Sequence, residues 1–258
     1  MDINVLVINV GNSRLALGAF VAGELEYIKR INIDQRGDWL GAIREAWSHI
    51  EARPDAAVAG ANVNPPLIES IEHVVMEATG QAVQWVGKKI DLPTKVLTEN
   101  PQETGVDRIL NVAAAYEQMQ KACMVVDAGT AITIDCCDDD GNFLGGAIAP
   151  GAKLMLDALH TQTAKLPQVA LDVPREAIGK TTQSAIQIGV YQAIRGLVRE
   201  LAENYAVELG SWPDIIATGG DAAKLFQDWE IIHAIAPDLT LYGIALAYAE
   251  HYIKHGEG

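Results

Sequence analysis

Short apolar runs and amphipathic stretches alternate along the chain, a pattern typical of an α/β protein. In the first half, apolar runs bounded by turn-forming residues predict strands at 4–8, 14–20, 24–31, 56–59 and 83–86. Helical spacing of apolar residues predicts helices around Leu40–Ile50 and Leu67–Val75, and a further helix is predicted over about 105–121. Loop-forming residues dominate between about 87 and 104.

The pattern restarts in the second half of the chain. Apolar runs predict strands at 123–127, 131–137, 143–148 and 214–218, and the turn Asp139–Asn142 joins two of them as a hairpin. Helices are predicted at 151–162, at 182–206, directly after Gly219-Gly220 and at 241–254.

Two segments, 118 residues apart, share one pattern. Val7–Ser13 and Val125–Ala131 each contain a buried strand, Asn or Asp, one further residue, Gly, a small polar residue and the start of a return strand. The same strand-strand-strand-helix order surrounds both copies. We therefore predict a duplicated α/β unit, with an N-terminal unit at 1–118 and a C-terminal unit at 119–258.

Charge and hydropathy narrow the classes of partner. The 258 residues include 34 acidic and 19 basic side chains, a net charge of -15, so we expect no sequence-independent affinity for nucleic acid or for an anionic membrane. No apolar run approaches the roughly 20 residues that a spanning helix needs. The N-terminal segment MDINVLVINVGNS lacks a basic start and predicts a buried strand rather than a signal peptide. We expect a cytoplasmic protein that acts on small molecules.

The cysteines and histidines predict no metal centre. Cys123, Cys136 and Cys137 form neither a disulfide framework nor a CxxC motif, and we expect them to be small core residues in a reducing compartment. The six histidines are expected to have no metal-ligand spacing. The Walker GxxxxGK[ST] and GxGxxG motifs are absent.

The two repeated hairpin tips are candidate phosphate loops. Glycine lets a backbone approach a ligand closely, and tip N–H groups or a hydroxyl can bind phosphate oxygens. A carboxylate at the end of the first strand, such as Asp127, can hold a cation beside those phosphates. Two such tips that face each other across a cleft would bind a nucleotide triphosphate tail. The alternative is a pair of ordinary tight hairpins, which the duplication disfavours.

Other loops carry further candidate chemistry. Thr218–Asp221 follows a buried strand and opens a helix, where N–H groups can bind a nucleoside or phosphate. In Asn100–Arg108, Arg108 lies near a predicted helix N-terminus, where its charge opposes the helix dipole, and this suggests an anionic ligand. Asp107 beside it could accept a proton from a hydroxyl group. A surface ion pair is the alternative there. Gly145–Gly151 implies close approach of a ligand, of a partner chain or of the chain's own backbone, and Gly179–Thr182 can be a simple helix cap.

Taken together, these motifs resemble the type III pantothenate kinases of the actin-like, Hsp70-like and sugar-kinase ATPase superfamily, over nearly the whole chain and in order. NVGNS is similar to the family's DxGNT loop, and ENPQETGVDR to its NPxxxGxDR motif. VVDAGTAITID and FLGGAIAPG are similar to the family's VDxGTATTxD and GGxIxPG motifs. Three later stretches of this chain, LPQV, IGKTTQSAIQIGV and TGGDAAKL, also resemble the family. The resemblance implies a duplicated ribonuclease-H-like, actin-like fold, in which two mixed sheets are flanked by helices with a cleft between them.

The resemblance also implies a reaction, the ATP-dependent phosphorylation of pantothenate to 4'-phosphopantothenate, the first step of coenzyme A biosynthesis. Asp107 would be the general base. The pantothenate site would consist of Thr98, Gly105, Val106, Asp107, Arg108 and Thr182. The ATP site would consist of Asn9, Val10, Gly11, Asn12, Ser13, Arg14, Leu15, Ala16, Thr130, Gly219 and Gly220. Asp127 would bind K⁺ or NH₄⁺, Mg²⁺ would accompany ATP, and the protein would be a homodimer with its site near the subunit interface.

Two positions depart from the family pattern. Asn9 stands where the family has Asp, so the shape is kept and the charge is lost. Thr98 stands where the family has Tyr, two residues before Asn-Pro, which removes packing area on the pantothenate side. Two alternatives follow: a catalytically weak relative that acts as a nucleotide-binding regulatory or accessory protein, or a kinase for another small hydroxyl acceptor.

Overall fold

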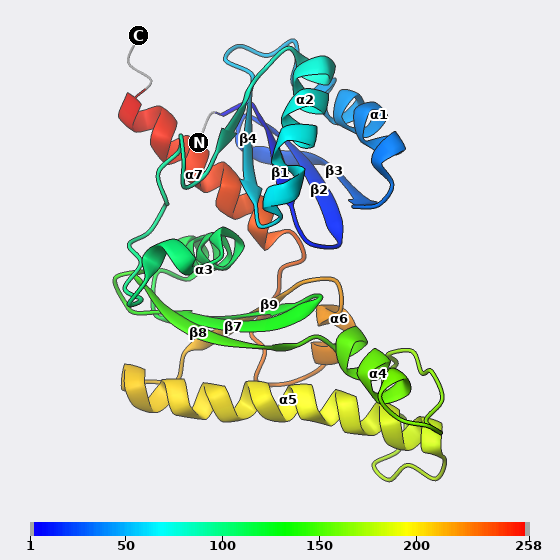
Figure 1. Cartoon of the computed structure of the whole chain (residues 1–258). Helices are drawn as coiled ribbons and strands as arrows, with labels where there is room; N and C mark the ends of the chain where they lie inside the picture. Colours follow the sequence, from blue (N-terminus) through cyan, green and yellow to red (C-terminus); the bar gives the residue numbers. More distant parts are fainter. Residues whose placement is uncertain (1–2, 256–258) are drawn as a thin grey trace. The chain divides into compact units, whose positions relative to one another are not determined.

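Contacts within the computed structural model, which describes residues 3–255, divide the chain into two compact units (Figure 1). Of the described residues, the first unit contains 3–95, 100–114 and 239–255, and the second contains 96–99 and 115–238. This division differs from the expected boundary after residue 118, because the C-terminal helix belongs to the first unit and a four-residue segment of the long loop belongs to the second. No helix among the described residues is long and apolar enough to cross a membrane.

The first unit is a five-stranded mixed sheet with helices on both faces. Its strand order is β3-β2-β1-β4-β5, in which β1 and β2 are antiparallel while β4 and β5 run parallel to β1. Its elements are β1 (Val5–Val10), β2 (Arg14–Val21), β3 (Glu24–Asn32), α1 (Arg36–Trp47), β4 (Ala57–Asn62), a 3₁₀ turn (Pro65–Leu67), α2 (Ile68–Thr79), β5 (Val83–Trp85), a second 3₁₀ turn (Pro101–Glu103), the start of α3 (Val106–Met119) and α7 (Leu239–His255).

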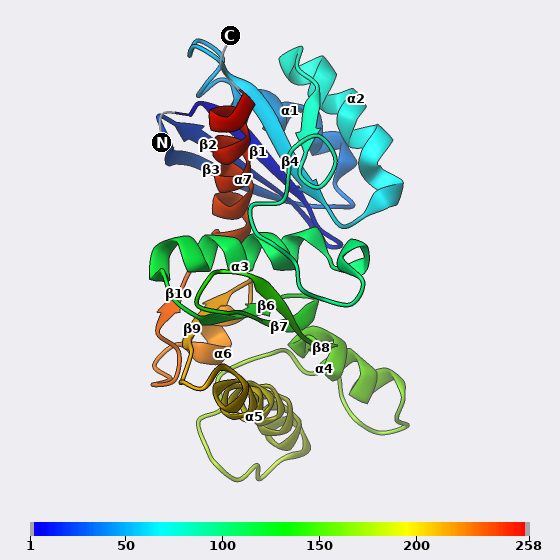
Figure 2. The ribbon, with the colours of Figure 1, turned by 90° about the vertical axis from the view of Figure 1, so that its left-hand side faces the viewer.

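Alternation along β1 explains why α7 joins this unit. Successive strand residues point to opposite faces, and β1 is apolar on both. Leu6 and Ile8 lie in a core cluster with α1 and α2, whereas Val5 and Val7 lie in a second cluster with α7. Figures 1 and 2 show α7 on the sheet face opposite α1 and α2. Without α7 the second face of β1 would expose its apolar side chains to water.

The second unit repeats the sheet. Its strand order is β10-β9-β6-β7-β8. Read from the β8 edge, this is the order of the first sheet, with β6 to β10 in the places of β1 to β5. Its elements are the end of α3, β6 (Cys123–Ala128), β7 (Ala131–Cys137), β8 (Phe143–Pro150), α4 (Ala152–Thr161), α5 (Thr182–Leu209), β9 (Asp214–Thr218), α6 (Ala222–Phe226) and β10 (Ala234–Ile235). Helices α4, α5 and α6 contribute to one apolar cluster with β6, β7 and β9.

The matching strand orders confirm the predicted duplication, and the registers refine it. Val10 pairs with Leu15 in the first hairpin, and Ala128 pairs with Ile132 in the second. Four residues therefore lie between the last paired residues of the first hairpin, and three lie between those of the second. The 118-residue offset holds along the first strand of each copy and becomes 117 on the return strand.

The three cysteines are free and buried, as expected. Cys123 and Cys137 are opposite each other on β6 and β7, with 3.4 Å between their Sγ atoms. Burial raises the pKa of the Cys136 thiol to about 12, which keeps this sulfur protonated and unreactive at neutral pH.

Candidate functional site

The first hairpin tip exposes polar side chains at the end of β1. Asn12, Ser13 and Arg14 are exposed, and the N–H of Gly11 donates to the carbonyl oxygen of Arg14 at 3.0 Å. This bond closes the tip, so the Gly11 amide is not a free donor for a ligand. Val10, Leu15 and Ala16 belong to the strands that hold the tip, and of these Val10 and Leu15 are fully buried.

Asn9 lies one residue before the end of β1, between Ala16 of β2 and Ala61 of β4 in the sheet register. Its Oδ1 is buried and has no hydrogen-bond partner among the described residues. A buried acceptor without a partner costs roughly 1–3 kcal/mol, so such atoms are uncommon in folded proteins. An orphaned oxygen at this position fits a donor that arrives from outside the chain, such as a water bound to Mg²⁺.

Asn62 was missed by the sequence reasoning. It ends β4 and pairs with Val10 in the parallel register, and its Nδ2 is also buried without a partner in the described part of the chain. The available signal was its place at the carboxyl end of the strand parallel to β1, because ligands of open α/β sheets bind at such ends.

The second hairpin tip is built like the first but is packed more tightly. The N–H of Gly129 donates to the carbonyl oxygen of Ala131 at 3.0 Å, and the N–H of Gly151 donates to the carbonyl oxygen of Thr130 at 3.0 Å. A Cβ on Gly151 would lie 2.2 Å from the carbonyl oxygen of Gly129, closer than any real contact. The glycine after Pro150 therefore lets the start of α4 press directly against the tip.

The third loop, Thr218–Asp221, meets the same tip. The N–H of Asp221 donates to the carbonyl oxygen of Ala128 at 3.0 Å, and Thr218 pairs with Asp127 across the parallel strands β9 and β6. Gly219 has φ +92°, and a Cβ there would lie 2.5 Å from both the Ala128 carbonyl oxygen and Asp127 Oδ1. The second unit thus brings Asp127, Thr130 and Gly219 together, and Gly220 follows in the same loop.

The Gly-Gly pair in β8 is explained by packing within the second unit. Gly146 pairs with Asp135, and a Cβ on Gly146 would lie 2.1 Å from the Ile134 carbonyl oxygen and 2.4 Å from Asp135 Oδ1. Of the expectations for Gly145–Gly151, close approach of the chain's own backbone accounts for Gly146 and Gly151. Asp135 itself is a buried carboxylate, 2% exposed, on the strand next to Asp127.

Asp107 lies in the first turn of α3, in the first unit. Burial raises the pKa of its carboxyl, and the hydrogen bond and positive charge of Arg108 lower that pKa by less. The backbone N–H of Arg108 donates to Asp107 Oδ1 at 2.9 Å, which holds the carboxylate in place. Gly105 adjoins it, because a Cβ there would lie 2.8 Å from the same oxygen. Gly105, Val106, Asp107 and Arg108 therefore form one half-buried group.

Thr98 and Thr182 occupy separate parts of the second unit. Thr98 follows Leu97, whose N–H donates to the Phe143 carbonyl oxygen at 2.8 Å, and its methyl group faces Gly145. Thr182 begins α5, but the helix cap is Thr181, whose Oγ1 accepts from the Ser184 N–H at 3.1 Å. The cap predicted within Gly179–Thr182 is therefore Thr181, and the exposed Thr182 side chain is left available to a ligand.

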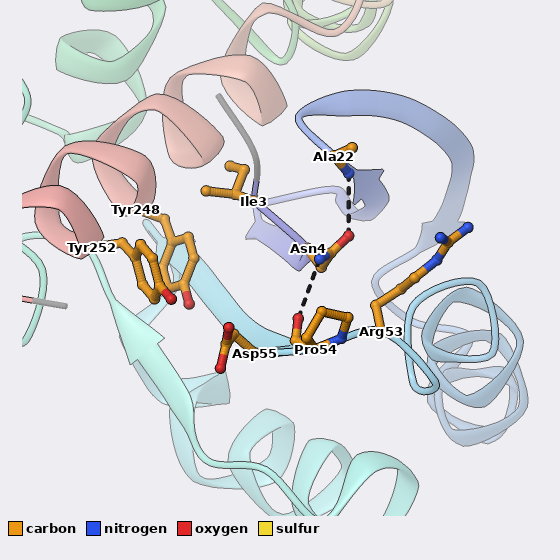
Figure 3. Close-up of a pocket in the computed structure, with 8 residues that line it drawn as sticks. All are labelled: Ile3, Asn4, Ala22, Arg53, Pro54, Asp55, Tyr248 and Tyr252. Carbon is orange, nitrogen blue, oxygen red and sulfur yellow. Dashed lines mark hydrogen bonds between the residues drawn. The ribbon is translucent and has the colours of Figure 1, made fainter. Parts of the chain in front are cut away.

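Two pockets among the described residues are lined by none of the predicted site residues. One, of about 280 Å³, is lined by Ile3, Asn4, Ala22, Arg53, Pro54, Asp55, Tyr248 and Tyr252 (Figure 3). The other, of about 420 Å³, is lined by residues between Phe226 and Ile235. In the first, Asn4 donates to the Pro54 carbonyl oxygen at 3.2 Å and accepts from the Ala22 N–H at 3.1 Å, so Asn4 joins two loops. Neither pocket shares a residue with the candidate site.

Comparisons with known proteins point to one family. A family model described as type III pantothenate kinase matches residues 5–204. Proteins named type III pantothenate kinase from Syntrophotalea carbinolica and Dehalococcoides mccartyi are 36% and 35% identical to the chain. These alignments cover 94% of the chain and 97% of the first relative, and 96% of the chain and 98% of the second.

Solved structures support the fold. A Baf-family protein from Campylobacter jejuni superposes with a TM-score of 0.60 at 23% identity, covering 95% of this chain and 98% of the other. MreB5 of Spiroplasma citri, solved with ADP, superposes with a TM-score of 0.51 at 11% identity, covering 98% of each chain. These likenesses, together with the two mixed sheets, confirm the predicted actin-like fold.

Proposed function

The chain belongs to the type III pantothenate kinase family, and from that premise we propose which of its residues carry out the reaction. The protein is a kinase that phosphorylates pantothenate in coenzyme A biosynthesis. A catalytically weak relative that acts as a nucleotide-binding regulatory or accessory protein is not favoured, because the relatives that match nearly the whole chain are named as kinases. A different small acceptor is not favoured, because these relatives are named as kinases of pantothenate.

Asp107 is the general base of this proposal, and its environment is the observation that carries it. A carboxylate in water is a weak base, with a pKa of about 3.9. Burial raises the pKa of Asp107, which makes its ionised form a better proton acceptor. The Arg108 N–H occupies Oδ1, so Oδ2 is the oxygen proposed to accept the proton.

The chemical step needs one proton acceptor and charge neutralisation at the phosphates. The terminal hydroxyl oxygen of pantothenate attacks the γ-phosphorus of ATP, and its proton passes to Asp107. The bond between the γ-phosphorus and the bridging oxygen breaks, and ADP leaves with the electron pair. Such transfers depend mostly on positioning and on stabilisation of negative charge.

Pantothenate is proposed to bind beside Asp107. Gly105 and Val106 are half-buried beside Asp107 and would contact the substrate, and Arg108 would offer a guanidinium for the pantothenate carboxylate. Thr182 is exposed at the start of α5 and offers a hydroxyl and a helix N-terminus. Thr98, with its methyl against Gly145, contributes a smaller contact than an aromatic ring would.

ATP is proposed to bind at the two hairpin tips. Because the Gly11 and Gly129 amides donate within their tips, the donors for phosphate would be the exposed side chains of Asn12, Ser13 and Arg14 and the hydroxyl of Thr130. Arg14 supplies a positive charge in a chain with a net charge of -15. Gly219 and Gly220, in the loop that packs against the second tip, would adjoin the adenosine.

Two cations are part of the proposal. Mg²⁺ would accompany ATP, and the orphaned Oδ1 of Asn9 fits a water bound to that ion. A monovalent cation, K⁺ or NH₄⁺, would be held by Asp127, whose carboxylate lies against Gly219 at the end of β6. Both ions would add positive charge near the phosphates to that of Arg14.

We also propose a cytoplasmic homodimer. Large apolar side chains remain exposed on the second unit, including Ile148 on β8 and Val207 on α5, which are 64% and 83% exposed. Contact with a second copy at these side chains would remove apolar surface from water.

The activity and its cation requirement can be tested together. We expect purified protein with ATP, Mg²⁺ and pantothenate to form 4'-phosphopantothenate in K⁺ buffer and much less in Na⁺ buffer, as read by mass spectrometry. Asp127→Asn should lower the rate in K⁺ by roughly tenfold or more, about 1.4 kcal/mol of barrier, and should remove the difference between the two buffers. Asp140→Asn, an exposed carboxylate of the same unit, is the matched control. Absence of product in K⁺ would contradict the function, whereas an unchanged K⁺ dependence in Asp127→Asn would contradict only the cation site.

Asn9→Asp tests the role of the orphaned oxygen. We expect the variant to turn over faster than the parent at limiting Mg²⁺, because a carboxylate holds Mg²⁺ and its waters more strongly than an amide. Without nucleotide, the buried charge should lower the free energy of unfolding by about 1–3 kcal/mol. Steady-state kinetics across Mg²⁺ concentrations and thermal unfolding measure the two effects. An equal or lower rate at every Mg²⁺ concentration would mean that the site is adapted to asparagine.

A further inference from the structure

The end of α7 and the loop after β5 bring three metal-ligating side chains together in the first unit. Asp91, His251 and His255 each offer one ligand atom, and these atoms all lie within 4.8 Å of one another. The expectation that the histidines have no metal-ligand spacing is therefore wrong for one pair. His251 and His255 are four residues apart in a helix, which places them on one face, as in helical zinc motifs.

His251 has an unsatisfied nitrogen in this group. Its Nδ1 is buried and has no hydrogen-bond partner within residues 3–255. The rings of His251 and His255 lie 4.5 Å apart at 51°. Leaving a buried ring nitrogen unpaired is unfavourable, and a metal ion would satisfy it.

Asp91 is held beside the helix by its neighbour. Ile90 is 1% exposed and lies in the same core cluster as Ala247 and Tyr248 of α7. The N–H of Ile90 donates to the Trp85 carbonyl oxygen at 3.1 Å, and the Gly87 N–H donates to the Ile90 carbonyl oxygen at 2.8 Å. This turn fixes the backbone from which the Asp91 carboxylate reaches the two imidazoles.

We propose that Asp91, His251 and His255 bind a transition-metal ion, with Zn²⁺ as the best fit. Two imidazoles and one carboxylate suit Zn²⁺, whereas Mg²⁺ and Ca²⁺ prefer oxygen ligands alone. Bonds of about 2.0–2.1 Å around a tetrahedral ion place ligand atoms roughly 3.4 Å apart. The exposed side chains of Asp91 and His255 can close to that spacing by rotation, and water would take the fourth position.

The bound ion would join the last turn of α7 to the loop after β5. Helix ends fray because their final carbonyls lack partners, so a link at His255 would hold the last turn in place. This role is structural and does not use any residue assigned to phosphoryl transfer.

Zinc titration of the full-length, untagged protein after chelator treatment tests the site. Isothermal calorimetry should show one Zn²⁺ per chain at this site. His255→Gln and Asp91→Asn should each weaken that binding tenfold or more, since each removes a direct ligand. His73→Gln, an exposed histidine on α2, is the matched control and should bind as the parent does. Zn²⁺ should raise the Tm of the parent and of the control, but not of His255→Gln.

Cobalt gives an independent readout of the ligand set. Co²⁺ in the same site should produce a visible absorption band that Zn²⁺ removes and that His255→Gln lacks. The proposal is overturned if the parent binds no Zn²⁺. It is also overturned if His255→Gln and Asp91→Asn bind the ion as tightly as His73→Gln.

Discussion

Replacing Asp107 by asparagine is expected to lower kcat by about 10²–10⁴-fold, the usual contribution of a positioned general base. The amide keeps the shape of the side chain and cannot accept the hydroxyl proton. Single-turnover measurement of 4'-phosphopantothenate formation at saturating ATP and pantothenate gives the effect on the chemical step. A variant that keeps the parental rate would show that Asp107 is not the base.

The same substitution should not destabilise the fold. The pKa of Asp107 is raised in the folded protein, so the ionised carboxylate is less favourable there than in the unfolded chain. Its contribution to stability therefore falls as the pH rises through the folded-state pKa, and at neutral pH the neutral asparagine avoids that cost. We expect an equal or higher Tm for Asp107→Asn, which separates loss of chemistry from loss of structure.

The acidic limb of the pH–rate profile provides a second check on Asp107. The base must be ionised, so kcat/KM should fall as the pH drops through its raised pKa. The midpoint of that fall should lie above the value of about 3.9 for an ordinary aspartate. A midpoint at or below that value would mean that burial does not tune this carboxylate.

Gly219→Ala is expected to cost about 3 kcal/mol of unfolding free energy, roughly 6–12 °C in Tm. Gly219 has φ +92°, a conformation that side chains with a Cβ rarely adopt. The new methyl would also lie 2.5 Å from the Ala128 carbonyl oxygen, a backbone atom that cannot rotate away. Relief of this overlap must shift the second hairpin tip, so we expect ATP affinity to fall as well.

Thermal unfolding with and without ATP, and nucleotide titration, measure these effects. Gly41→Ala is the control, because Gly41 is exposed within α1 and a Cβ there would meet nothing within 4 Å. Helix propensity predicts that Gly41→Ala stabilises the protein by about 0.5–1 kcal/mol. A Gly219→Ala variant as stable as the parent, with unchanged ATP affinity, would contradict the close packing of this loop against the tip.

Most of the secondary structure followed from local periodicity. The strands Arg14–Val21 and Ala131–Cys137 and the helix Thr182–Leu209 lie where alternation or helical spacing predicted them. The two-residue strand Ala234–Ile235 was missed, because two residues are too few to show a period. Its existence depends on pairing with β9, a contact that the chain makes only when folded.

The site was predictable where a motif carries its own chemistry. The order of Asn9–Gly11, Asp107–Arg108 and Asp127–Thr130 along the chain was enough to suggest the family. The reason for the glycines could not be predicted. From the sequence, Gly146 and Gly151 could equally have been ligand contacts, and only the positions of Asp135 and Gly129 show that packing within the chain requires them.

By itself, the sequence determined the duplicated strand pattern, the helices, the loop motifs and, through them, the family. These features are local, since each depends on residues a few positions apart along one element. The tertiary structure alone decided the membership of α7 in the first unit, the orphaned oxygen of Asn9, the raised pKa of Asp107 and the meeting of Asp91 with His251 and His255. Each of these depends on how distant segments pack and exclude water, and burial of that kind leaves no periodic trace in the sequence.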